Sequence, residues 1–349
     1  MPQHSNVQRL ASGPAVLRGA ATKSAAAAAG LLLALLLGAC GSSDDGADQA
    51  AAAAGLPSGA RLIDDDPSCT APRCFELDIP LPDGVNVTDT RVRVLVPADY
   101  ASSGKRYPLL YLLHDAPGDY TSWTRRGAAQ AQTEGLDVIA VMPDGGGGNP
   151  GWYTNWTSGE FQWETYHLDV MMPYVERRLR VLGDGHRAVA GPSMGGHGAM
   201  YYSALRPGLF QAAAGFSGAV DFLVLDRGSA AVASLLSMPA GPVWGDPVTN
   251  FPMWQAHDPA THIDGLAGMK IYLTSGNGLP GGPYDELGSP ELYVIEPLLY
   301  VMNLSFAAAL TRAGIEHETN FYGPGFHDWP YYHDAFTWAL PKLLDAIAP

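Results

Sequence analysis

The stretch AVAGPSMGGH at residues 188–197 decides the fold that we expect for this 349-residue chain. Small apolar residues lead into the pattern G-x-S-x-G, and a segment compatible with a helix, AMYYSAL, follows at 199–205. A strand, a serine between glycines and a helix, in this order, make up a nucleophile elbow, which presents the serine hydroxyl at the edge of a sheet. Although G-x-S-x-G alone also occurs in ordinary glycine-rich turns, this context predicts that Ser193 is a nucleophile.

Apolar runs on both sides of this stretch predict the rest of the sheet. Leu109–Leu113 and Val138–Met142 are short and continuous, as in parallel strands covered on both faces. Further strands are expected at 75–79, 91–96, 187–190, 210–216, 270–274 and 318–322, and helices at 163–179, 196–205, 296–313 and 331–347. Strands that alternate with helices predict an α/β protein with a mostly parallel central sheet and helices on both faces. Together with the elbow, this pattern indicates the α/β-hydrolase fold.

A serine hydroxyl needs a base, usually a histidine that a carboxylate orients, and in this architecture the chain order is serine, acid, histidine. His327 lies in GPGFHDW at 323–329, just beyond the last expected strand, where the base should fall. The other histidines after Ser193 are expected to be surface or packing residues: His257, His262, His317 and His333. We therefore predict that His327 is the base.

The acid cannot be chosen from spacing. The segment after the expected strand 270–274 offers Asp285, Glu286, Glu291 and Glu296, and any of them could be folded back to the histidine. Glu296 also has a plain structural explanation, because a glutamate is favourable at the start of a helix.

Composition narrows the class of protein. With 47% hydrophobic and 16% charged residues the chain can bury a sizeable core, which excludes a wholly disordered protein. The 20 basic and 35 acidic residues give a net charge of −15, the wrong sign for a nucleic-acid partner. Gly145–Gly148 lacks the Lys-Ser/Thr pair of a phosphate-binding loop and is expected to be a flexible active-site loop. We expect no cofactor and no metal.

The N-terminal residues look like a targeting segment. Arg9, Arg18 and Lys23 precede an apolar stretch that ends Leu-Gly-Ala-Cys at Cys40, which resembles the signal of bacterial lipoproteins. An uncleaved membrane-spanning helix is the alternative, but the apolar stretch is shorter than the roughly 20 residues that it needs. We expect a signal peptide at 1–39, a lipidated Cys40 and flexible linker at 40–60, and an α/β-hydrolase catalytic domain at 61–349. The protein would then be exported and anchored to the outer face of the cytoplasmic membrane by its lipid only.

Cys69 and Cys74 enclose the short segment SCTAPRC. In an exported chain the two cysteines are expected to form a structural disulfide, the alternative being two free thiols.

Six stretches together resemble the antigen 85 mycolyltransferases within the wider esterase D-like group, from about residue 75 to the C-terminus. They are Trp163-Glu164-Thr165, Gly191-Pro192-Ser193-Met194, Trp244-Gly245, His257-Asp258-Pro259, Gly276-Asn277-Gly278 and His327-Asp328-Trp329. The resemblance implies that Glu296, seven residues before Asn303-Leu304, is the triad acid, with Asp285 as runner-up.

Acyl transfer also needs N–H donors for an oxyanion. The residue after the nucleophile, Met194, supplies one, and the resemblance puts Ala116 at the second position. The chain departs from the family here, because the usual Asp-Gly-Leu-Arg reads His114-Asp115-Ala116-Pro117 and lacks the arginine near the acyl-acceptor site. The family's cysteine before Gly-Asn-Gly is replaced by Ser275.

Three tryptophans, Trp152, Trp156 and Trp329, are candidates for contact with substrate, and the alternative for each is a packing role. The sequence thus predicts a serine esterase or acyltransferase that acts on an acyl ester or a glycolipid-type small molecule. Such an enzyme would form an acyl-serine intermediate and pass the acyl group to water or to a sugar or glycerol-type hydroxyl. The alternative is a non-catalytic surface lipoprotein that uses the same fold for adhesion or ligand binding.

Overall fold

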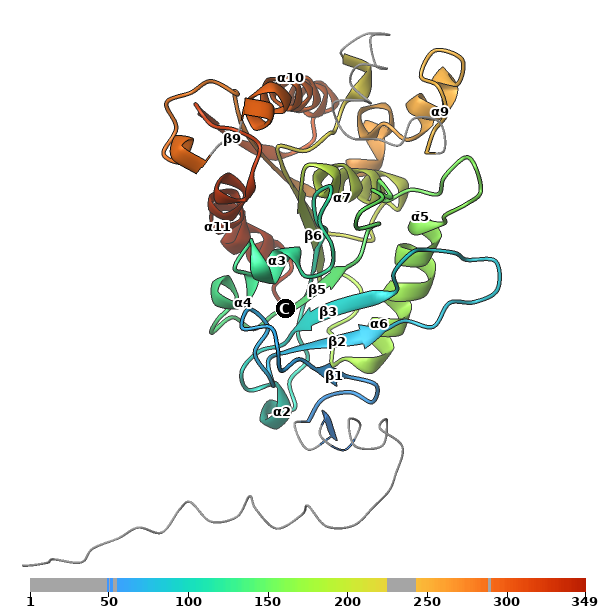
Figure 1. Ribbon diagram of the computed structural model, residues 1–349, viewed down its shortest axis with the longest axis vertical. Helices are drawn as coiled ribbons and strands as arrows, with labels where there is room; N and C mark the ends of the chain where they lie inside the picture. The colour runs from blue at the N-terminus through green and yellow to red at the C-terminus, as the bar shows by residue number, and fades with distance from the viewer. Residues whose placement is uncertain (1–48, 50, 53–54, 225–242, 288–289) are drawn as a thin grey trace, which may run out of the picture. The chain divides into compact units, whose positions relative to one another are not determined.

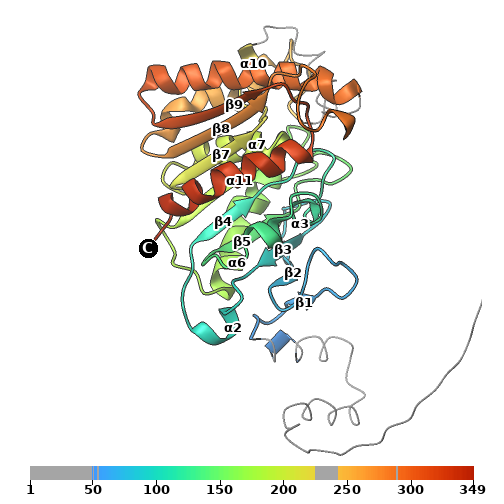
Figure 2. The same ribbon diagram turned by 90° about the vertical axis from the view of Figure 1, so that its left-hand side faces the viewer.

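A nine-stranded sheet organises the part of the chain that the computed structural model describes, which is residues 49, 51–52, 55–224, 243–287 and 290–349. Its strands are β1 (Arg61–Leu62), β2 (Cys74–Asp78), β3 (Arg91–Leu95), β4 (Leu109–Leu112), β5 (Ile139–Pro143), β6 (Arg187–Pro192), β7 (Ala212–Phe216), β8 (Lys270–Gly276) and β9 (His317–Gly323). They follow the order β1-β2-β3-β5-β4-β6-β7-β8-β9 (Figures 1 and 2). Six neighbouring strands are parallel to one another: β5, β4, β6, β7, β8 and β9. Strands β3, β2 and β1 extend the sheet beyond β5, and each is antiparallel to its neighbour.

Helices cover both faces of this sheet. They are α2 (Tyr100–Ser103), α3 (Ser122–Arg125), α4 (Ala129–Gln132), α5 (Trp163–Thr165), the π-helix η1 (Tyr166–Met171), α6 (Met172–Arg178), α7 (Met194–Leu205), α9 (Phe251–Ala256), the 3₁₀ helices η3 (Pro259–Leu266) and η4 (Asp285–Leu287), α10 (Pro290–Ala313) and α11 (Trp329–Ala346). Figure 2 shows α11 in front of the sheet, running in nearly the same direction as the strands. The fold is therefore the predicted α/β-hydrolase architecture.

Alternate strand residues enter two separate cores. Tyr111, Val141 and Val189 pack with residues of α6, α7 and α10 on one face. Leu112, Ala140 and Ala190 pack with residues of α3 and α11 on the other face. Because both faces are buried, these strands are apolar throughout, which is why the sequence shows continuous runs rather than alternation.

Helix α10 covers the edge of the sheet beside β8 and β9. Its segment Leu292–Ala313 has a mean hydropathy of 1.5 and is long and apolar enough to cross a membrane by length and composition alone. Its fully buried apolar side chains nevertheless belong to the main core: Leu299, Met302, Phe306 and Leu310. We therefore describe α10 as a core helix.

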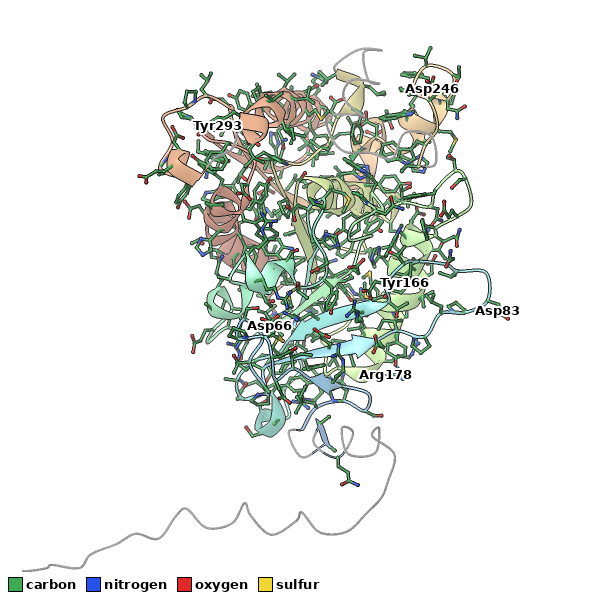
Figure 3. All side chains as sticks on the ribbon, in the orientation of Figure 1. Asp66, Asp83, Tyr166, Arg178, Asp246 and Tyr293 are labelled. Atoms are coloured by element: carbon green, nitrogen blue, oxygen red, sulfur yellow. A yellow bond between two sulfur atoms is a disulfide. The ribbon has the colours of Figure 1, made fainter. Side chains whose placement is uncertain are left out.

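The expected strands and helices are present, and most bounds differ by one to three residues. The helical stretch expected at 163–179 is present, and its middle part, Tyr166–Met171, is a π-helix rather than an α-helix. Pro173, which has no backbone N–H to donate, follows at the start of α6. The hydroxyl of Tyr166 donates to Thr90 O at 2.8 Å and so links this irregular helix to the segment that enters β3 (Figure 3).

Cys74, the first residue of β2, forms a disulfide with Cys69 in the segment that leads into this strand. Residues 1–39 and Cys40 lie outside the described residues, so the targeting segment and the lipidation site stay predictions.

Candidate active site

Ser193 lies in the turn between β6 and α7. Its backbone has φ 52° and ψ −118°, a conformation that non-glycine residues adopt rarely and that marks strain. The turn is fixed by hydrogen bonds from Ser193 N to Phe216 O at 2.9 Å and from His197 N to Ser193 O at 3.1 Å. The sharp turn places the side chain at the carboxyl end of β6, and the residue as a whole is 7% exposed.

The flanking glycines allow close backbone contact around this turn. A Cβ atom on Gly191 would lie 2.5 Å from the carbonyl carbon of Gly195. A Cβ on Gly195 would lie 2.4 Å from Leu113 O and 2.8 Å from His114 O, in the loop after β4. The glycines of the G-x-S-x-G pattern thus let α7 approach both β6 and the loop expected to hold an oxyanion donor.

Ser193, His327 and Glu296 form one chain of hydrogen bonds. His327 Nε2 lies 2.9 Å from Ser193 Oγ, and His327 Nδ1 lies 2.8 Å from Glu296 Oε2. A carboxylate oxygen can only accept, so Nδ1 carries the ring proton and Nε2 is free to accept from the serine hydroxyl. Ser193 lies in the β6–α7 turn, Glu296 on α10 and His327 in the loop after β9, and the structure brings these three predicted site residues together.

The Glu296 carboxylate is fully buried and its second oxygen is saturated with donors. Glu296 Oε1 accepts from Ser217 Oγ at 2.6 Å, from Gly276 N at 2.7 Å and from Ser275 Oγ at 3.2 Å. These bonds leave Oε2 for the imidazole. Asp285, the runner-up, instead accepts from the backbone N–H groups of Gly281 and Gly282.

Helix α10 also holds the backbone of His327, the predicted base. His327 N donates to Leu292 O at 3.2 Å, one turn before Glu296 on the same helix. His327 is thus hydrogen-bonded to α10 through both its backbone N–H and its imidazole.

The loop after β4 is fixed by its own histidine. His114 Nε2 accepts from Gly145 N at 2.7 Å, so Nδ1 carries the proton and donates to Asp115 O at 2.7 Å. Tyr153 donates to His114 O at 3.1 Å. These bonds connect His114 and Asp115, the two residues before the predicted oxyanion donor Ala116, to Gly145, the first residue of the glycine run. The other predicted donor, Met194, is the first residue of α7, where an N–H has no acceptor within its helix.

The three candidate tryptophans are buried, with 1% of Trp152, 4% of Trp156 and 3% of Trp329 exposed. Trp152 packs edge-on against Phe222 and Trp244, and Trp156 packs edge-on against Phe161. In this structure the rings make packing contacts, and their contact with substrate stays a prediction.

Other buried titratable groups have clear structural explanations. Burial lowers the pKa of His167 to about 3 and that of His197 to about 4, so both rings are neutral in the core at pH 7. Burial, together with the nearby Asp221, raises the pKa of Asp258 to about 8. Asp258 accepts from Ala260 N and Leu223 N, which connects η3 to the segment after β7. Among the described residues, no group of three metal-binding side chains is found.

Sequence reasoning missed Ser217, which follows β7 directly. Its backbone has a φ of 46°, in the left-handed region, and its hydroxyl donates to the Glu296 carboxylate, 79 residues further along the chain. A serine directly after a buried strand was the available signal, but nothing in the sequence names its partner.

The parallel sheet, the serine turn and the hydroxyl–imidazole–carboxylate chain together define an α/β-hydrolase. Residues 87–343 match the family model described as "Putative esterase", and the chain belongs to this esterase family. Esterase MT1326 and Esterase Rv1288 of Mycobacterium tuberculosis are each 34% identical to it over 270 residues, 74% of this chain and 56% of theirs. The chain thus spans only about half the length of these curated relatives.

Three further matches agree with this assignment. The MPT51 antigen of Mycobacterium leprae is 29% identical over 176 residues, 49% of this chain and 57% of the antigen, which confirms the resemblance to the antigen 85 group. The structure of Mycobacterium tuberculosis MPT51 (FbpC1) has a TM-score of 0.61 at 22% identity, covering 78% of this chain and 98% of that one. FphF of Staphylococcus aureus, a fluorophosphonate-binding serine hydrolase, has a TM-score of 0.59 at 20% identity, with coverages of 78% and 98%. At these identities the two structures show the fold alone.

Proposed function

We propose that this protein is a serine esterase that forms an acyl-Ser193 intermediate. The observation that carries the proposal is the uninterrupted hydrogen-bond chain from Ser193 Oγ through His327 to Glu296, built on a strained strand-to-helix turn. The match to the esterase family supports the same reaction class.

In the proposed first half-reaction, Ser193 Oγ attacks the ester carbonyl carbon while its proton passes to His327 Nε2. Glu296 stabilises the imidazolium through Nδ1–H, and the N–H groups of Met194 and Ala116 donate to the oxyanion. The intermediate collapses, the bond to the leaving alcohol breaks, and His327 returns the proton to that alcohol. Acyl-Ser193 remains.

In the second half-reaction, a water or alcohol molecule gives its proton to His327 and attacks the acyl carbon, and Ser193 recovers its proton. We propose water as the main acceptor, because the two curated relatives are named esterases and because Pro117 stands in place of the family's arginine. Transfer to a sugar or glycerol-type hydroxyl is the alternative outcome. The proposed substrate is an acyl ester or a glycolipid-type ester.

A fluorophosphonate probe tests the nucleophile. We expect it to label the wild-type protein at Ser193 and not to label Ser193→Ala, and we expect that variant to lose about 10⁶-fold in kcat. Absence of labelling in the folded wild-type protein would overturn the proposal and favour a binding role for the fold.

Product analysis then separates the two acceptors. An acyl ester is incubated with the enzyme in the presence and absence of glycerol or a sugar, and the products are separated by mass. Free acid alone supports hydrolysis, whereas new esters that appear only with the acceptor establish transfer.

We also propose that the protein is exported and held at the membrane by lipid on Cys40, with residues 1–39 as signal peptide, 40–60 as linker and 61–349 as the catalytic domain. The cysteine at the end of the apolar N-terminal stretch supports this. Expression of wild type and Cys40→Ala in a bacterial host, followed by detergent phase partition, tests it. The wild type should partition with the detergent and the variant should not.

A further inference from the structure

A buried hydrogen bond joins the loop after β4 to the loop that carries the base. Trp329 Nε1 donates to Asp115 Oδ2 at 3.1 Å, across 214 residues of sequence. Asp115 directly precedes Ala116, and Trp329 follows His327 by two residues and is the first residue of α11. The bond therefore joins the loop that carries Ala116, a proposed oxyanion donor, to the segment that carries His327, the proposed base.

Arg126 adds a second connection between the same loops. Its Nη1 lies 3.6 Å from Asp115 Oδ2, and its Nη2 donates to Asp328 Oδ1 at 2.7 Å. The same Asp328 oxygen accepts from Trp329 N at 2.7 Å and so caps α11. The guanidinium carbon of Arg126 lies 5.4 Å from the centre of the Trp329 ring. We call Asp115, Arg126, Asp328 and Trp329 the loop clamp.

Glycines make room for the loop clamp. A Cβ atom on Gly118 would lie 2.6 Å from Asp115 Oδ1, and one on Gly127 would lie 2.7 Å from the Trp329 ring. Trp123 packs edge-on against Trp329 with ring centres 5.3 Å apart, and its Nε1 donates to Leu113 O at 2.9 Å. The Asp115 carboxylate and the Trp329 indole are thus closely packed by the residues around them, which restricts their positions.

Asp115 is an unfavourable residue for a purely structural purpose. It is 6% exposed, and its Oδ1 has no hydrogen-bond partner in the part of the chain that the structure describes. Burial raises the pKa of Asp115, with Arg126 as the largest opposing influence. A buried carboxyl with one unpaired oxygen lowers stability, and such features are tolerated where they hold a functional geometry.

We propose that Asp115 and Trp329 are positioning residues of the esterase reaction, and that their hydrogen bond sets the distance between the oxyanion loop and His327. The inference rests on the proposed function. It predicts loss of transition-state stabilisation, with unchanged substrate binding, when the bond is removed.

A double-mutant cycle tests the bond directly. Asp115→Ala and Trp329→Phe each remove it, and we expect each to lower kcat about 10-fold with little change in KM, because the bond involves a carboxylate. The double variant should be no slower than the slower single variant, since both substitutions break one interaction. Asp115→Asn, whose side-chain oxygen can still accept from Trp329 Nε1, should recover most of the activity.

Binding of an aryl boronic acid, which forms a tetrahedral adduct with a reactive serine, gives the readout that a structural role alone would not change. Its affinity should fall by the same factor as kcat in Asp115→Ala and Trp329→Phe, while the melting temperature of Trp329→Phe stays close to that of the wild type. Trp338→Phe is the matched control, because Trp338 lies on the same helix and packs on Tyr272 away from the loop clamp. Trp338→Phe should leave both the affinity for the boronic acid and kcat unchanged.

Arg126→Gln and Arg206→Gln form a second matched pair, because both arginine side chains are 45% exposed and paired with an aspartate. We expect a loss of a fewfold in kcat for Arg126→Gln and none for Arg206→Gln. Gly118→Ala, which displaces the carboxylate without removing it, should resemble Asp115→Ala.

Three outcomes would overturn the inference while the proposed function stands: additive effects in the cycle, full activity of Trp329→Phe, or losses in KM alone. If Asp115→Ala does not fold, Asp115→Asn and Trp329→Phe still decide the question. A wild-type protein that fluorophosphonate does not label at Ser193 would instead contradict the proposed function.

Discussion

Ser217 Oγ lies 2.6 Å from Glu296 Oε1, the oxygen that does not face the base. With Gly276 N and Ser275 Oγ also donating to that oxygen, the carboxylate has one orientation available and presents Oε2 to His327 Nδ1. Residues at the ends of β7 and β8 therefore fix the orientation of the Glu296 carboxylate, the proposed acid.

Ser217→Ala should lower kcat about 10-fold, because a hydrogen bond to a buried charge contributes roughly 1.5 to 3 kcal/mol. Ser275→Ala should have a smaller effect, since its bond is longer, at 3.2 Å. Steady-state kinetics with a chromogenic ester measure both. Ser203→Ala, a buried serine in α7 that donates only to Ala199 O, serves as control and should retain full activity. Equal losses in all three variants would contradict the supporting role.

Glu296→Gln should lower kcat about 10⁴-fold, the effect of placing an amide where a triad histidine needs an acceptor. Asp285→Asn should leave kcat within twofold, because that carboxylate is bound to the loop at Gly281 and Gly282. The two variants are compared by ester hydrolysis and by the rate of fluorophosphonate labelling. A larger loss in Asp285→Asn would reassign the acid.

Gly195→Ala should destabilise the protein by about 1 to 3 kcal/mol, because the new methyl group meets backbone carbonyl oxygens that cannot rotate away. Gly215→Ala in β7 is the matched control, since its nearest neighbour is the flexible end of Met200 at 3.4 Å. Denaturant unfolding gives both free energies. The close contact at Gly195 would be disproved by two variants of equal stability.

The raised pKa of Asp258 predicts a pH-dependent stability. The unfolded carboxyl titrates near 3.8 and the folded one near 8, so the folded state binds more protons between these values. The free energy of unfolding should therefore fall as pH rises through this window and level off above it. Urea denaturation at several pH values should show a flatter profile for Asp258→Asn, and Asp221→Asn should end the fall at a lower pH. Identical profiles for all three proteins would refute the assignment.

The parts of the structure that depend on local pattern could be predicted from the sequence. The continuous apolar runs at 109–113 and 138–142 predicted β4 and β5, because strands buried on both faces need apolar residues at every position. The serine turn and His327 could be predicted because both lie shortly after a strand, and the carboxyl ends of parallel strands share one edge of the sheet.

Contacts between distant segments could not be predicted in this way. Glu296 was indistinguishable by spacing from its neighbouring carboxylates, because its role depends on how α10 packs beside β8. Ser217 and Asp115 act on partners 79 and 214 residues away, and local patterning carries no information on those pairings. The π-helix was missed because its apolar periodicity is close to that of an α-helix.

The first turns of α10 carry the Glu296 carboxylate. Through Leu292 O they also bind the backbone N–H of His327. A small shift of this helix would move acid and base as one body and preserve their separation. The distance to Ser193, which lies in the turn between β6 and α7, would change instead. The serine–histidine distance is thus more sensitive to the position of α10 than the histidine–glutamate distance is.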